Sequence, residues 1–132
     1  MTKSATIDGN SFSNLDGFYV EVERKLTRGL DWSIGRNLDA FNDVLRGGFG
    51  LHEYGEPLEL IWQSSSKSEK DLGYAETLKY VEAKLLSCHP ANVPYVQQDL
   101  EDLKAGKGQM LFDIILGIIR SPEHDHITFT LL

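Results

Sequence analysis

The fold is decided by residues 35–48, which read GRNLDAFNDVLRGG. Asn37 is of a residue type that caps helix N-termini, because its side-chain oxygen can accept a hydrogen bond from a free backbone N–H. Apolar residues then recur at helical spacing, at Leu38, Phe41, Val44 and Leu45. The pair Gly47 and Gly48 adopts left-handed backbone at little cost and therefore ends a helix. The stretch predicts a short amphipathic helix with one buried face.

Two aspartates lie on the other side of this predicted helix. Asp39 and Asp43 are four residues apart, which places them on one helical face. Asp39 also lies in the first turn, where the helix dipole favours a negative charge. Two like charges at this spacing disfavour an isolated helix by a few tenths of a kcal/mol. A solvated acidic face explains the pair without any partner, and a surface that binds a cationic partner is the alternative.

Other segments of the chain have a periodicity of their own. The apolar pattern between residues 15 and 26 predicts an amphipathic helix that is capped by Ser13 and ended by Gly29. Residues 57–62 predict a largely buried strand, and the serine-rich residues 64–68 predict a polar break after it. The remaining predicted elements are a strand over residues 4–7, helices near residues 74–85, 96–103 and 110–119, and a final strand over residues 126–132.

The order of these elements predicts the fold class. Strands separated by helices are typical of an α/β fold, here a small three-stranded parallel sheet covered by helices. Residues 110–119 contain too many apolar side chains for a one-sided helix, so we expect a buried helix against the sheet.

Composition limits the classes of function. The 132 residues fit one domain, and a net charge of -7 argues against non-specific binding to nucleic acid while suiting a cationic partner. Cys88 is the single cysteine, so the chain has no internal disulfide. The N-terminus lacks an apolar run of signal-peptide length, and residues 110–119 contain Asp113 and are too short to span a bilayer. We therefore expect a cytoplasmic protein that does not bind membranes.

In sequence order, four pieces of this chain resemble the barstar family of bacterial ribonuclease inhibitors. They are residues 7–9 (IDG), 35–43 (GRNLDAFND), 57–62 (PLELIW) and 127–129 (ITF). The Gly-x-Asn-Leu-Asp-Ala run is the most specific piece, and together the pieces span roughly two-thirds of the chain. The resemblance implies a single barstar-like domain over residues 1–132, in which about residues 74–107 form a helical insertion before the last long helix.

The resemblance also implies a function and a set of binding residues. In the family, the second helix and the loop before it block the active site of a barnase-like ribonuclease, and an aspartate on the helix takes the place of the substrate phosphate. Asp43 matches that aspartate, and Asp39 matches a second aspartate one turn earlier. The partner-binding surface is then predicted from Trp32, Ser33, Ile34, Gly35, Asn37, Leu38, Asp39, Asn42, Asp43, Arg46 and Gly47. The implied protein has no cofactor and no catalytic residue, is a monomer when free, and protects the producing cell, in one version as the immunity protein of a toxin.

Other interpretations of the sequence stay open. Asp39 and Asp43 could serve a small acidic enzyme as an acid/base pair or hold Mg²⁺. Residues 123–126 (EHDH) form either a polar turn or part of a metal site, which would need further ligands from elsewhere. Residues 52–55 belong either to the rim of the binding surface or to an ordinary loop. Residues 74–105 could instead make the chain an adaptor that binds another protein.

Overall fold

A computed structural model describes residues 2–27, 35–48 and 50–132. The elements follow in the order β1 (Lys3–Asp8), the 3-10 turn η1 (Gly9–Ser11), α1 (Leu15–Leu26), α2 (Leu38–Arg46), β2 (Leu58–Gln63), α3 (Ser65–Asp71), α4 (Tyr74–Ser87), η2 (Pro90–Asn92), α5 (Val93–Lys104), α6 (Leu111–Ile119), η3 (Pro122–His124) and β3 (Ile127–Leu131). No helix within these described ranges is long and apolar enough to cross a membrane.

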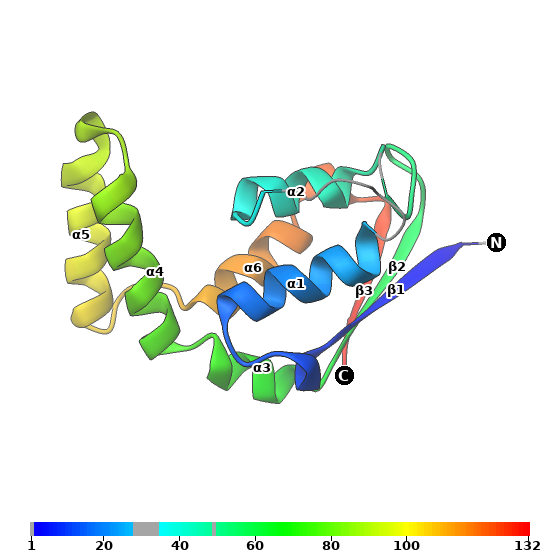
Figure 1. Cartoon of the computed structure of the whole chain (residues 1–132), viewed down its shortest axis with the longest axis horizontal. Helices are drawn as coiled ribbons and strands as arrows, with labels where there is room; N and C mark the ends of the chain where they lie inside the picture. The colour runs from blue at the N-terminus through cyan, green and yellow to red at the C-terminus, as the bar shows by residue number, and fades with distance from the viewer. Residues whose placement is uncertain (1, 28–34, 49) are drawn as a thin grey trace.

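The three strands form one parallel sheet in the order β1-β2-β3. Ala5 pairs with Leu60, and Leu60 pairs with Phe129, so these three apolar side chains point to the same face of the sheet. Figure 1 shows α1, α2 and α6 on one side of the sheet, with the hairpin of α4 and α5 at the end of the helical layer. The predicted α/β fold with a small parallel sheet and a helical segment before α6 is confirmed.

Aromatic side chains form the centre of the core between helices and sheet. Trp62, Phe18 and Phe41 are all fully buried. The ring of Phe18 stacks on Trp62 at 5.4 Å between centroids and meets the ring of Phe41 edge-on at 5.2 Å. This cluster joins β2, α1 and α2, so the apolar side of α2 is held against the sheet.

Two local predictions concern the ends of α1. The cap of α1 is Asn14, whose side chain accepts a hydrogen bond from the Gly17 N–H at 2.8 Å, and not Ser13. Helix α1 ends at Leu26 with Thr27 as its C-cap, and the predicted helix end at Gly29 lies outside the described residues.

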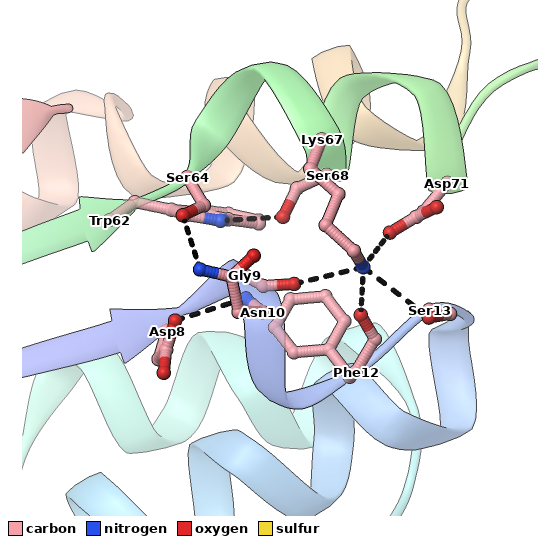
Figure 2. Close-up of polar contacts among 10 residues, drawn as sticks. All are labelled: Asp8, Gly9, Asn10, Phe12, Ser13, Trp62, Ser64, Lys67, Ser68 and Asp71. Atoms are coloured by element: carbon pink, nitrogen blue, oxygen red, sulfur yellow. Dashed lines mark hydrogen bonds and ion pairs between the residues drawn. The ribbon is translucent and has the colours of Figure 1, made fainter.

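The serine-rich stretch after β2 is not a break, because it begins a helix. Ser68 of α3 is fully buried and its Oγ accepts a hydrogen bond from the Trp62 indole Nε1–H at 3.0 Å. Lys67 reaches back to the segment after β1, where its Nζ donates to the carbonyl oxygen of Phe12 at 2.7 Å (Figure 2). The same Nζ pairs with Asp71 of its own helix at 2.6 Å. Tertiary polar contacts of this kind override the weak helix preference of serine.

Replacing Ser68 tests the buried hydrogen bond. Ser68→Ala leaves the Trp62 indole N–H buried without an acceptor, which should lower the free energy of unfolding by about 1–3 kcal/mol in denaturant titrations followed by circular dichroism. Ser66→Ala is the matched control, because Ser66 is exposed on the same helix. Equal stability of the two variants would contradict the assigned role of Ser68.

Candidate functional site

Helix α2 is shaped from both ends by its own sequence. The Asn37 side chain accepts a hydrogen bond from the Ala40 N–H at 2.7 Å, as its residue type predicts. Gly47 follows the helix with φ 88°, and a Cβ at this position would lie 2.2 Å from the Glu53 carbonyl oxygen. Only glycine fits there, which confirms the predicted end of the helix.

The two faces of α2 differ sharply in exposure. Phe41, Val44 and Leu45 are fully buried in the core. The opposite side carries the α2 face, which we define as Asp39, Asn42, Asp43 and Arg46. The Asp43 side chain is 60% exposed, and Asp39 is exposed as well. The helix therefore presents two carboxylates one turn apart to solvent on a rigid support.

Arg46 links the α2 face to a third acid, Glu123 of η3. Its guanidinium donates to the Glu123 carboxylate at 2.9 Å and to Asp43 Oδ1 at a longer 3.4 Å. The hydrogen bond from Arg46 holds the pKa of the Glu123 carboxyl below its ordinary value. The contact between Arg46 and Asp43 is long and exposed, so it contributes little to stability and leaves Asp43 available to a partner.

Three histidines fasten the C-terminal end of α2. The carbonyl oxygen of Leu45 accepts hydrogen bonds from Nε2–H of His52 at 3.0 Å and from Nε2–H of His126 at 2.8 Å. Nε2 of His124 lies 2.7 Å from the amide oxygen of Asn42. The two bonds to Leu45 satisfy a backbone carbonyl that a helix end leaves without a partner, and the contact with His124 holds the Asn42 side chain of the α2 face in place.

The remaining predicted site residues differ in how exposed they are. Gly35 is exposed beside the helix N-terminus, while Leu38 is half-buried against the core. Gly47 is buried, and it ends the helix. Trp32, Ser33 and Ile34 lie outside the described residues.

Sequence reasoning missed the parts of this site that come from distant segments. The sequence predicts a polar turn or part of a metal site for residues 123–126, and a loop or rim position for His52. In the structure, Glu123 and the three histidines all contact α2 or its side chains. Within residues 2–27, 35–48 and 50–132, no group of three His, Cys, Asp or Glu side chains is arranged to hold a metal ion.

Comparison with protein families finds a match for the N-terminal part of the chain. The family model described as Barstar (barnase inhibitor) matches residues 2–85. The chain belongs to the barstar family. A search of the curated proteins found no match to the chain. The barstar match includes β1, the whole of α2 and β2, and ends within α4, so the α2 face lies inside the matched region. The family is one of inhibitors and not of enzymes.

The buried His124 gives the stability of this barstar-family chain a pH dependence. Burial lowers the pKa of its imidazole from the ordinary value of 6.5, opposed by Glu123 and assisted by His126 and Arg46. As the pH falls, the unfolded chain therefore binds this proton before the folded chain does. Stability that is present above pH 6.5 is lost as the pH falls below that value.

We expect His124→Gln to reduce this loss. Denaturant unfolding at pH values from about 7 to about 5.5 should show a shallower decline for His124→Gln than for the wild type, in the window where unperturbed histidine titrates. His89→Gln is the matched control, because His89 is exposed, and it should follow the wild-type decline. Parallel declines for the wild type and His124→Gln would show that another group causes the pH dependence.

Proposed function

We propose that this chain inhibits a barnase-like microbial ribonuclease by inserting the α2 face into its active site. Asp43 and Asp39 take the position of the substrate phosphate, and Gly35, Asn37, Leu38 and the predicted residues Trp32, Ser33 and Ile34 complete the contact surface. The inhibitor acts as a monomer without a cofactor. Inhibition protects the cell that produces the ribonuclease, or a cell that is exposed to it as a toxin.

The observation that carries this proposal is the pair of exposed carboxylates on a helix that is fixed along its buried side and at both ends. A ribonuclease active site binds phosphate with cationic donors, and a carboxylate accepts from a guanidinium fork much as a phosphate does. Because α2 is already held in place, little conformational entropy is lost when a partner binds. Membership of the barstar family supports the choice of a ribonuclease as the partner.

Removing Asp43 should abolish most of the inhibition. An ion pair that becomes buried in an interface costs about 2 kcal/mol or more when one partner is truncated, which corresponds to roughly a 30-fold rise in Kd. Asp43→Ala should therefore weaken inhibition in a ribonuclease assay at least to this extent.

Glu59→Ala is the control for the change in net charge, because Glu59 is exposed on the sheet face away from the buried core. It should inhibit as the wild type does. If Asp43→Ala inhibits as strongly as Glu59→Ala, the α2 face is not the inhibitory surface.

The net charge of -7 should accelerate association with a cationic enzyme. Raising the salt concentration from about 50 mM to about 500 mM should slow association at least several-fold while changing dissociation much less, because screening acts mainly on the long-range encounter. Stopped-flow mixing measures both rates. An association rate that does not depend on salt would exclude electrostatic steering.

A further inference from the structure

A hollow of about 360 Å³ lies beyond the C-terminal end of α2, between the loop that follows this helix and the turn that leads into β3 (Figure 1). Tyr54 and Gly55 line the hollow on the loop side, and Glu123 and Asp125 line it on the β3 side. Arg46 lines it from α2. Because Arg46 also belongs to the α2 face, the hollow adjoins that face.

The loop that carries Tyr54 is fixed to the end of α2. The Gly55 N–H donates a hydrogen bond to the carbonyl oxygen of Arg46 at 2.9 Å. The Gly48 N–H donates to the carbonyl oxygen of His52 at 3.0 Å, and the His52 side chain is buried. The loop wall of the hollow is therefore formed before any partner binds.

The side chain of Tyr54 is 79% exposed although its backbone is held in place. An aromatic ring on a fixed backbone offers a large contact area at small entropic cost, because only two side-chain torsions must be ordered when a partner binds. Tyrosine is also enriched among the residues that dominate the energy of protein interfaces. The hollow thus places an aromatic ring of this kind next to the α2 face.

The polar lining of the hollow carries a net negative charge. Arg46 and Glu123 form an ion pair at 2.9 Å, so their charges largely compensate each other. Asp125 is exposed and forms no ion pair within the described part of the chain. The remaining polar side chain, His126, already donates its Nε2–H to the carbonyl oxygen of Leu45. An aromatic ring and an uncompensated carboxylate in one hollow suit a guanidinium or ammonium group.

We propose that Tyr54 and Asp125 together bind one arginine or lysine side chain of the ribonuclease, beside the site that the α2 face occupies. This inference rests on the proposed function, because it assigns a further contact to the same partner. An enzyme that binds phosphate has cationic side chains at its active site. The face of the Tyr54 ring attracts such a cation, and the Asp125 carboxylate pairs with it. The loop over residues 52–55 is then part of the rim of the binding surface.

Removing either group tests the proposal against a matched control. With a barnase-like ribonuclease as the probe, Tyr54→Ala and Asp125→Asn should each raise Kd about tenfold. Tyr95→Ala and Asp99→Asn should each change Kd less than about twofold, because these exposed residues belong to α5 and do not line the hollow. Circular dichroism checks that each variant is folded.

The double variant Tyr54→Ala/Asp125→Asn tests whether the two groups bind the same side chain. Effects of residues that share a partner are not additive in free energy. The double variant should therefore raise Kd clearly less than the product of the two single effects, which is about 100-fold if each is about tenfold. Single effects that multiply to their full product would contradict a shared cation.

Asp43→Ala, measured in parallel, separates this inference from the proposed function. If Asp43→Ala loses affinity while either Tyr54→Ala or Asp125→Asn binds as the wild type does, the two groups do not bind a cation together and the α2 mechanism stands. If the wild-type chain does not bind the ribonuclease at all, the proposed function fails and this inference fails with it.

Discussion

The orientation of the α2 face depends on one carbonyl group, that of Leu45 at the end of α2. Two imidazoles, from His52 and His126, donate to its oxygen at 3.0 and 2.8 Å. His52 follows α2 directly, whereas His126 comes from the turn before β3 at the other end of the chain. Because β3 pairs with β2 in a parallel sheet, its preceding turn is delivered to the C-terminal end of α2. The sheet order thus determines which way the α2 face points.

Helix α2 is held in place before any partner binds, and this suits an inhibitor. The carboxylates of Asp39 and Asp43 are exposed on a helix whose other side is buried, and the pairing of Asp43 with Arg46 is weak. Such a surface can exchange an internal contact for a stronger one with a cationic partner at small entropic cost.

Local signals predicted much of this structure, and contacts between distant segments account for what was missed. The cap at Asn37, the buried positions of α2 and the helix end at Gly47 all follow from neighbouring residues. Helix α3 was missed because Ser68 is held by Trp62 through a tertiary hydrogen bond that no serine-rich pattern announces. Glu123 is separated from Arg46 by 77 positions, so neither periodicity nor spacing could place it beside α2.

The central claim is that the carboxylates of α2 occupy the phosphate site of a ribonuclease. It is tested most directly by competition between this chain and a 3′-mononucleotide for a barnase-like ribonuclease, at constant ionic strength. The chain and the nucleotide should exclude one another, so the apparent Kd of the chain should rise in proportion to the nucleotide concentration once the nucleotide site is saturated. An unchanged Kd, with the chain and the nucleotide bound to the same enzyme molecule, would contradict it.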